Sequence, residues 1–190
     1  MAQKKTAVFV GSLRKESLNR KMAKALIKAA PDSLTLEIVE IGGLPFYNQD
    51  LEDNPPDAYT QFRKSLRGFD AVLFVTPEYN RSVPAVLKNA LDVGSRPYGQ
   101  NAWNGKPGAV VSVSVGAIGG FGANHHLRQS LSCLNVPTMQ QPEAYIGNVD
   151  NLFDGKGNLT SDPTRKFITG FMRAFAEWIA RFTLNTSGGG

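Results

Sequence analysis

The chain has 190 residues, with 21 lysines and arginines against 16 aspartates and glutamates, and a formal net charge of +5. This length is typical of one domain with a sizeable core, and a hydrophobic fraction of 42% excludes an intrinsically disordered chain. The single cysteine, Cys133, excludes an internal disulfide and a cysteine-based metal cluster, and no apolar run is long enough to span a membrane. We therefore expect one domain over residues 1–184, a disordered tail over residues 185–190 and a cytoplasmic location.

Apolar runs alternate along the chain with segments of helical periodicity. The predicted strands cover residues 6–10, 35–41, 71–75, 109–115 and 144–146, and the predicted helices cover residues 17–29, 58–67, 84–93, 124–134 and 163–182. Strands that alternate with helices form a parallel sheet with helices on both faces. Five such units with a ligand loop after the first strand predict a doubly wound, flavodoxin-like α/β fold with strand order 2-1-3-4-5.

Two of the predicted helices carry apolar side chains at helical spacing. In the last helix the stripe is typical of core packing. Its members are Phe167, Ile168, Phe171, Phe175, Trp178, Ile179 and Phe182. In the helix before it we expect Cys133 to be a buried small side chain rather than a nucleophile.

The loop after the first strand is rich in hydrogen-bond donors and reads Gly11-Ser12-Leu13-Arg14-Lys15-Glu16-Ser17-Leu18-Asn19. A strand, a turn and a helix N-terminus in this order form an anion site, because free backbone N–H groups and the helix dipole point at the turn. The hydroxyls of Ser12 and Ser17 add donors that suit a phosphate monoester, as do the Asn19 amide and the Arg14 guanidinium. A dinucleotide site needs the glycine spacing G-x-G-x-x-G, and this loop has a single glycine. The loop favours a mononucleotide, although taken alone it is equally consistent with a turn in which Ser17 caps the helix.

The segment after the third strand reads Thr76-Pro77-Glu78-Tyr79-Asn80-Arg81-Ser82-Val83-Pro84. Its prolines predict a rigid, extended backbone that presents fixed N–H and C=O groups to the edge of a ligand ring. Tyr79 would pack on or beside the ring, and Asn80 would bond to one of its edges. The alternative is a stiff connection with a surface tyrosine. We favour the ligand site, because polar groups gather here where the predicted topology needs a ligand.

The loop after the fourth strand has four glycines between residues 116 and 122. Glycine permits positive φ angles and lets a ligand approach the backbone closely, although glycine loops also occur without ligands. Ser114 and Gly116 are the expected contacts to the ligand ring. Chemically rich loops therefore follow strands 1, 3 and 4, which is where this fold class binds its ligands.

Together the three loops resemble the NADPH-dependent FMN reductase family of flavodoxin-like proteins, and especially its bacterial quinone and chromate reductases. The motifs are Gly11-Ser12-Leu13-Arg14 with Ser17 and Asn19, Thr76-Pro77-Glu78-Tyr79-Asn80 with Ser82-Val83-Pro84, and Gly116 with Gly119-Gly120. The resemblance extends from about residue 6 to residue 182. It implies a tightly but non-covalently bound FMN, NADPH or NADH as the electron donor, and assembly as a homodimer or homotetramer.

The resemblance also implies roles for single residues. The FMN phosphate would be held by Ser12, Arg14, Ser17 and Asn19, and the ring would lie against Pro77, Glu78, Tyr79, Asn80, Ser114 and Gly116. Relatives often carry a tyrosine where this chain has Arg81, which places a positive charge near the mouth of the site.

No catalytic side chain and no metal are predicted, because the flavin N5 would carry the chemistry. The expected cycle is ping-pong: NAD(P)H transfers hydride to the flavin and leaves, and a quinone, chromate or similar small acceptor then takes the electrons. Arg81 and Arg96 are predicted to bind substrate, since they suit nicotinamide phosphates or an oxyanion. An exposed, helix-terminal role for Arg96 is equally consistent.

Two other classes of protein are possible on the sequence alone. A flavodoxin-like electron carrier has no NAD(P)H oxidation of its own and is often acidic, and the basic balance of this chain argues mildly against it. The other class is a regulatory nucleotide-binding module without a cofactor. The basic residues are scattered, so we expect neither nucleic acid nor a membrane as partner.

Overall fold

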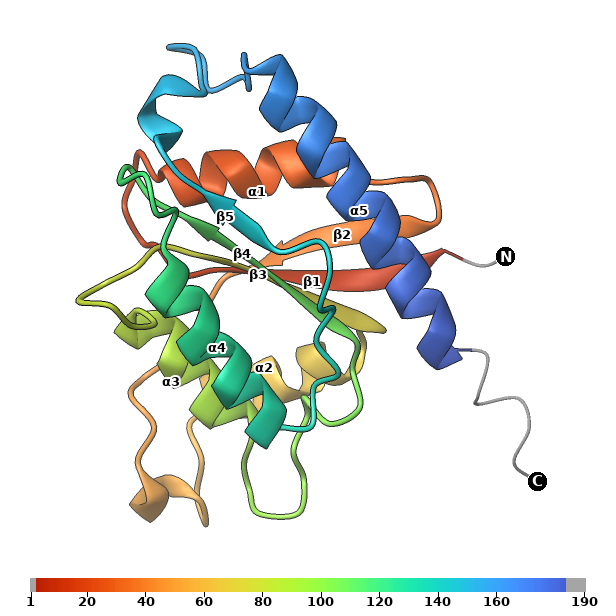
Figure 1. Ribbon diagram of the computed structural model, residues 1–190. Coiled ribbons are helices and arrows are strands. Elements are labelled where there is room, and N and C mark those ends of the chain that lie inside the picture. Colours follow the sequence, from red (N-terminus) through yellow and green to blue (C-terminus); the bar gives the residue numbers. More distant parts are fainter. Residues whose placement is uncertain (1–2, 184–190) are drawn as a thin grey trace.

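Five apolar segments pair side by side and in parallel to form one sheet in the computed structural model, which describes residues 3–183 (Figure 1). The strands are β1 Lys4–Val10, β2 Leu34–Val39, β3 Ala71–Thr76, β4 Gly108–Val113 and β5 Ala144–Ile146. The helices are α1 Leu18–Lys28, α2 Asp57–Arg67, α3 Ala85–Gly94, α4 Phe121–Cys133 and α5 Asp162–Thr183, with short 3-10 helices η1 Gln49–Leu51 and η2 Val149–Asn151. The strand order β2-β1-β3-β4-β5 confirms the predicted flavodoxin-like fold.

The register of the central strands brings three loops together at one edge of the sheet. Val10 at the end of β1 pairs with Val75 of β3, and Thr76 at the end of β3 pairs with Ser112 of β4. Every residue of β3 and β4 is buried, as expected for central strands of a parallel sheet. The loops that follow β1, β3 and β4 therefore leave the sheet side by side.

Each face of the sheet carries its own apolar core. Helices α1 and α5 cover one face, and α2, α3 and α4 cover the other (Figure 1). In the second core the Trp103 ring is fully buried and lies 5.1 Å from the Phe9 ring and 5.8 Å from the Phe74 ring, between centroids. Its indole N–H donates to the Leu91 carbonyl oxygen at 3.0 Å, so the one polar atom of the ring is satisfied.

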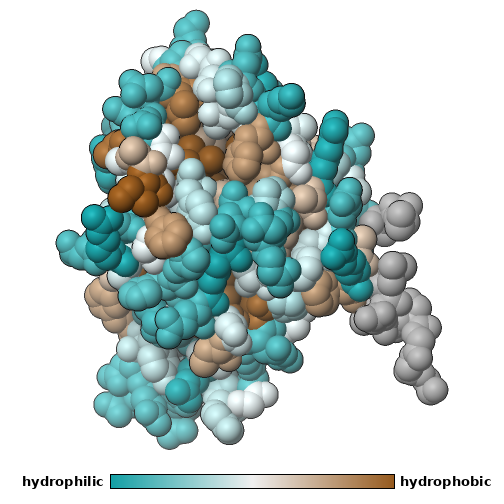
Figure 2. Space-filling model, viewed as in Figure 1, coloured by the Kyte–Doolittle hydropathy of each residue, from teal (hydrophilic) through white to brown (hydrophobic). Residues whose placement is uncertain are grey.

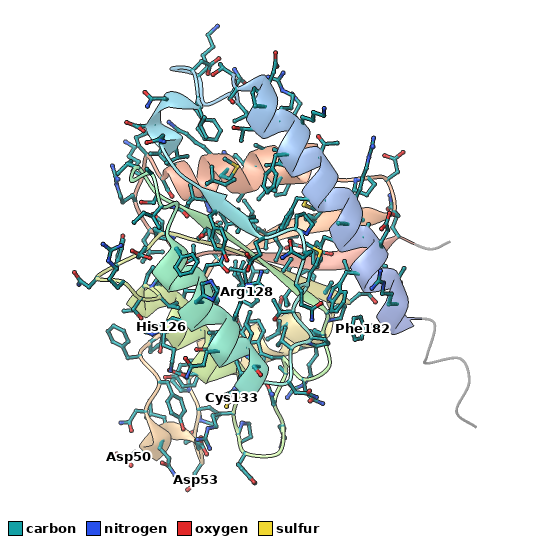
Figure 3. All side chains as sticks on the ribbon, in the orientation of Figure 1. Asp50, Asp53, His126, Arg128, Cys133 and Phe182 are labelled. Carbon is teal, nitrogen blue, oxygen red and sulfur yellow. The ribbon has the colours of Figure 1, made fainter. Side chains whose placement is uncertain are left out.

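The apolar stripe of α5 packs mainly as predicted. Ile168, Phe171, Phe175 and Ile179 are buried in the first core. Phe167 is exposed near the start of the helix, so the prediction of core packing was wrong there. Trp178 is half-buried, donates its indole N–H to the Pro137 carbonyl oxygen at 2.9 Å and packs against Phe182 near the end of the helix (Figure 3).

Two sequence predictions differ from the structure around α4. The helix begins at Phe121, three residues before its predicted start, because Gly120 turns the chain with a φ of 75°. The prediction that Cys133 is buried was wrong, since its side chain is exposed at the end of α4 (Figure 3). Leu131 is fully buried, and two further residues turn a helix by about 200°, which carries Cys133 to the solvent side.

The predicted tail, residues 185–190, lies outside the described residues, and a single domain over residues 1–184 stays a prediction. No helix within residues 3–183 is both long and apolar enough to cross a membrane.

Candidate functional site

A cavity of about 180 Å³ opens at the edge of the sheet where β1, β3 and β4 end. It brings together most of the residues that the sequence predicts to hold a cofactor. Its lining consists of Ser12, Arg14, Leu18, Asn19, Pro77, Glu78, Tyr79, Val113, Ser114, Val115 and Val149. The predicted residues Ser17, Asn80, Gly116, Arg81 and Arg96 are not part of this lining.

Helix α1 points its N-terminus at one end of the cavity. Ser17 caps the helix, and its Oγ accepts a hydrogen bond from the Arg20 backbone N–H at 3.1 Å. Leu18 and Asn19 are the first two residues of α1, and their backbone N–H groups have no acceptor within the helix. No acidic residue lies in the first turn, so the positive end of the helix dipole is not neutralised from within α1. The capping role and the anion site therefore coexist.

Asn19 is the side chain that most clearly fits a bound cofactor. It is 7% exposed and lines the cavity, and its Oδ1 has no hydrogen-bond partner among the described residues. An unpaired buried amide oxygen is costly, so a ligand donor at this position would stabilise the site. FMN carries hydroxyl donors on its ribityl chain and acceptors on its phosphate, which suit both ends of an amide. With Ser12 and Arg14 beside it, this part of the cavity fits the expected cofactor.

The segment after β3 folds into a short hairpin rather than the extended backbone that its prolines predict. Tyr79 and Ser82 exchange two backbone hydrogen bonds of 3.0 Å each. Asn80 and Arg81 form the turn, with φ angles of 51° and 64°. Two residues of positive φ are characteristic of the type I′ turn that joins tightly paired strands. Pro77, Glu78 and Tyr79 still line the cavity, whereas Asn80 lies exposed at the tip of this hairpin, residues 79–82.

Glu78 and Arg81 form an ion pair at the rim of the cavity. The Arg81 guanidinium donates to Glu78 Oε1 at 3.0 Å, and the second oxygen, Oε2, accepts from the Ala123 backbone N–H at 3.0 Å. The Glu78 side chain is only 12% exposed, whereas that of Arg81 is 76% exposed. The arginine therefore keeps most of its donors free for solvent or an anion.

In the glycine loop after β4, Ser114 faces the cavity and Gly116 lies outside its lining. Ser114 Oγ accepts from the Gly116 backbone N–H at 3.1 Å, so that N–H is used within the loop. Gly119 has a φ of 64°, and a Cβ there would lie 2.6 Å from the backbone carbon of Tyr145. A glycine is therefore required at residue 119 by both conformation and space.

Arg96 lies far from this cavity in its own chain. The hairpin precedes α3, and Arg96 follows the other end of that ten-residue helix, about 15 Å along its axis. There its guanidinium lies over the Tyr47 ring, with Nε 3.8 Å from Glu52 Oε1. A contact between Arg96 and a flavin would require the cavity of another copy of the chain.

Sequence reasoning missed four apolar residues of the lining and one buried polar residue beneath it. The apolar residues are Leu18, Val113, Val115 and Val149. Asn124 is fully buried, donates to Ser112 Oγ at 3.2 Å and accepts from Arg128 Nε at 2.8 Å, and so ties α4 to the sheet. Val149 belongs to η2, and no local motif marks it. The polar partners of Asn124 could have marked it as a buried polar residue only if α4 had been predicted to begin at residue 121.

Exposed apolar side chains surround the cavity. Several large ones lie in the three loops that form it, and in the space-filling view apolar groups gather on the side where the strands end (Figure 2). We call them the apolar rim, and they are Leu13, Tyr79, Val115, Ile118 and Phe121. Such a patch beside a cavity marks a surface that binds apolar molecules.

An aromatic group of Phe121, His125 and Tyr145 continues this rim. The Phe121 ring centroid lies 4.2 Å from that of His125 and 5.3 Å from that of Tyr145. Tyr145 Oη lies 3.1 Å from His125 Nε2. Burial, aided by a hydrogen bond with Glu143, raises the pKa of Tyr145 to about 12, so its hydroxyl stays protonated at neutral pH.

A second hollow, a groove of about 460 Å³, separates α3 from α4. Lys88, Leu91, His126 and Cys133 are among its lining residues, and His126 Nδ1 lies 2.9 Å from Ser82 Oγ of the hairpin. Within residues 3–183, no three histidine, cysteine or acidic side chains cluster as metal ligands would.

Known proteins match this chain along most of its length. The family model described as NADPH-dependent FMN reductase matches residues 4–151. A quinone reductase of Pseudomonas putida is 65% identical over 174 residues, which cover 91% of this chain and 93% of that protein. A 2-hydroxy-1,4-benzoquinone reductase of a Burkholderia species is 47% identical over 92% of this chain and 96% of its own length. The structure of FerB, a flavoenzyme NAD(P)H:(acceptor) oxidoreductase from Paracoccus denitrificans, has a TM-score of 0.89 at 44% identity and covers 94% of this chain and 98% of that one.

Proposed function

This chain belongs to the NADPH-dependent FMN reductase family, and we propose that it passes electrons from NAD(P)H through FMN to quinones. It is an FMN-dependent NAD(P)H oxidoreductase, and FMN is its cofactor. The observation that carries the proposal is the cavity itself, in which phosphate donors from the first loop meet apolar and aromatic walls from the third and fourth strands.

When bound, FMN supplies the chemistry of accepting and donating a hydride equivalent, and the protein supplies binding and orientation. The proposed phosphate ligands are Ser12, Arg14 and Asn19 with the N-terminus of α1, and Ser17 supports them as the cap. The proposed ring contacts are Pro77, Glu78, Tyr79 and Ser114, with Asn80 and Gly116 contributing from the outer ends of their loops. Val113 and Val149, which are both buried, exclude water from the inner wall.

The apolar rim supports a quinone as the acceptor. A quinone is flat and largely apolar, and the exposed side chains of Val115 and Ile118 offer it a matching surface beside the cavity. Two of the relatives are named as quinone reductases of bacteria. Arg81 supports a second class of substrate, because its exposed guanidinium suits an oxyanion such as chromate or the phosphates of NAD(P)H.

We further propose that the chain assembles as a homodimer or a homotetramer. The groove between α3 and α4 offers a hollow next to the hairpin, and a second copy seated there would bury the exposed side chains of His126 and Cys133. Assembly is also the route by which Arg96 reaches a flavin and binds substrate. Sedimentation velocity measures the mass directly.

A cytoplasmic location is proposed from the chemistry of the chain. A single cysteine, exposed at Cys133, suits a reducing compartment, and NAD(P)H is a metabolite of the cytoplasm. Fractionation of cells that express the chain tests the proposal.

The visible spectrum of the purified protein, recorded before and after anaerobic addition of NADPH or NADH, tests the function. We expect a yellow flavin spectrum that bleaches with one of the two donors and recovers when a quinone is added. A yellow protein that neither donor bleaches would be an electron carrier. A colourless protein that takes up no added FMN would contradict the proposal.

A further inference from the structure

The Glu78 carboxylate joins two loops that are far apart in the sequence. It lies at the start of the segment after β3, and its Oε2 accepts the backbone N–H of Ala123, 45 residues later, at 3.0 Å. The other oxygen accepts from Arg81 at 3.0 Å. Because the Glu78 side chain is only 12% exposed, its contact with the Ala123 N–H is largely shielded from water, whereas Arg81, which is 76% exposed, pairs with it from the solvent side.

The partner of this carboxylate is a helix end without a cap of its own. Helix α4 begins after Gly120, which makes no side-chain capping bond, and its first turn contains no acidic residue. Ala123 is the third residue of the helix, whose N–H an ordinary capping side chain satisfies from within the same segment. Here Glu78 satisfies that N–H from another strand's loop, and its negative charge complements the helix dipole.

The two loops pack closely against each other at Gly122. A Cβ on Gly122 would lie 2.9 Å from the Arg81 carbonyl oxygen and 2.9 Å from Glu78 Oε2. Ser82 Oγ at the end of the hairpin lies 2.9 Å from His126 Nδ1 on the next turn of α4. The hairpin therefore rests on the first turns of α4 at Gly122 and His126, and the neighbouring Glu78 adds the hydrogen bond from Ala123.

The turn of the hairpin brings the Arg81 guanidinium back to the Glu78 carboxylate. Arg81 has a φ of 64°, a conformation that side chains other than glycine adopt at a cost. The ion pair with Glu78 offsets part of that cost, since it holds the guanidinium at 3.0 Å from a shielded carboxylate.

We propose that Glu78 is a positioning residue, whose carboxylate fixes hairpin 79–82 on the N-terminus of α4 and thereby sets the spacing of the two walls that receive the flavin ring. One wall carries Tyr79, and the other carries Ser114 in the loop that leads into α4. This proposal rests on the FMN site described under the proposed function. It gives the Glu78 carboxylate an indirect role, distinct from the ring contact proposed for the backbone of this segment: the carboxylate holds the protein wall, and the wall holds the ring.

Hydrogen exchange and FMN affinity, measured on the full-length protein, test the proposal together. Glu78→Ala removes both contacts, whereas Glu78→Gln keeps an oxygen that accepts the Ala123 N–H but loses the charge that pairs with Arg81. The matched control is Glu40→Ala, which removes an exposed carboxylate that follows β2, pairs with Arg20 and lies outside the cavity lining.

We expect Glu78→Ala to speed amide exchange at residues 119–126 about tenfold and to weaken FMN binding about tenfold, since a shielded charged hydrogen bond is lost. Glu78→Gln should weaken FMN binding less than Glu78→Ala does, and Glu40→Ala should change neither measurement. If Glu78→Ala does not fold, Glu78→Gln and Ser82→Ala carry the test, and both should speed exchange at the start of α4.

Unchanged exchange at residues 119–126 in these variants would overturn the proposal, as would faster exchange with an unchanged FMN dissociation constant. Equal loss of FMN affinity in Glu78→Gln and Glu78→Ala, with exchange unaltered in Glu78→Gln, would indicate that the carboxylate itself contacts the cofactor and would also overturn the proposal. Titration of the wild-type protein with FMN separates a failure of this proposal from a failure of the proposed function. Only the second would leave the wild-type protein unable to bind FMN.

Discussion

The two ends of the candidate site are held by different kinds of contact, local at one end and long-range at the other. At the phosphate end, the loop between β1 and α1 is organised by contacts within one short segment, with Ser17 capping its own helix at Arg20. At the ring end, the hairpin and the glycine loop hold each other through contacts such as Glu78 with Ala123, between residues 45 positions apart. Local contacts leave their signature in a sequence motif, whereas the second kind depends on the register of the whole sheet.

The largest loss of stability at the ring end should come from Gly119→Ala. The new Cβ would meet the backbone of Tyr145 at 2.6 Å in a position of positive φ, so the loop or β5 must move. We expect a loss of about 2–4 kcal/mol in the free energy of unfolding, measured by urea titration. Gly43→Ala is the control, because nothing lies within 4 Å of a Cβ there, and its effect should stay within about 0.5 kcal/mol. Equal effects of the two changes would mean that the glycine loop is not fixed against β5.

At the phosphate end, Arg14→Ala should weaken binding without unfolding the protein. Arg14 is exposed and lines the cavity, and loss of a charge-assisted hydrogen bond of about 1.5–3 kcal/mol corresponds to roughly 10- to 100-fold in FMN affinity. Fluorescence titrations with FMN and with riboflavin, which lacks the phosphate, make the measurement. Only FMN should be affected, and a parallel loss of riboflavin affinity would place Arg14 near the ring instead.

The contrast between local and long-range contacts explains which features could be predicted from the sequence. The five strands, the helices on both faces and the first loop follow from periodicity and local motifs, and the matched family and the strand order confirm the family and the fold. The hairpin at residues 79–82 was not predicted, because Asn80 and Arg81 lack the glycine that usually marks such a turn. Val149 was missed because it reaches the cavity from η2, beyond β5. These features depend on which segments the completed sheet brings together.

Ser17→Asp separates the two roles of the first loop. Aspartate caps a helix as well as serine does, so the free energy of unfolding should change by less than about 0.5 kcal/mol, whereas Ser17→Ala should cost about 1 kcal/mol. The added negative charge beside the phosphate site should still lower FMN affinity about tenfold. If Ser17→Asp bound FMN as tightly as the wild-type protein, the phosphate would lie elsewhere.

The smallest effect concerns Tyr145 at the ring end. Its pKa is raised in the folded protein from 10.0 to about 12, so the unfolded chain releases this proton first. The stabilising contribution is therefore complete below pH 10 and is lost as the pH rises toward 12. Melting temperatures across this interval should fall less steeply in Tyr145→Phe than in the wild-type protein. Tyr98→Phe, at a tyrosine that is 91% exposed, is the control and should follow the wild-type curve.

The placement of the two tryptophans makes the protein its own optical probe. Trp103 is sealed among phenylalanines on one face of the sheet, and Trp178 is half-buried on α5 at the other face. Their emission spectra should differ in colour, and Trp103→Phe and Trp178→Phe leave one reporter on each face. Coincident unfolding curves from the two single-tryptophan proteins would establish that both faces unfold in one cooperative step. Separate curves would show which face unfolds first.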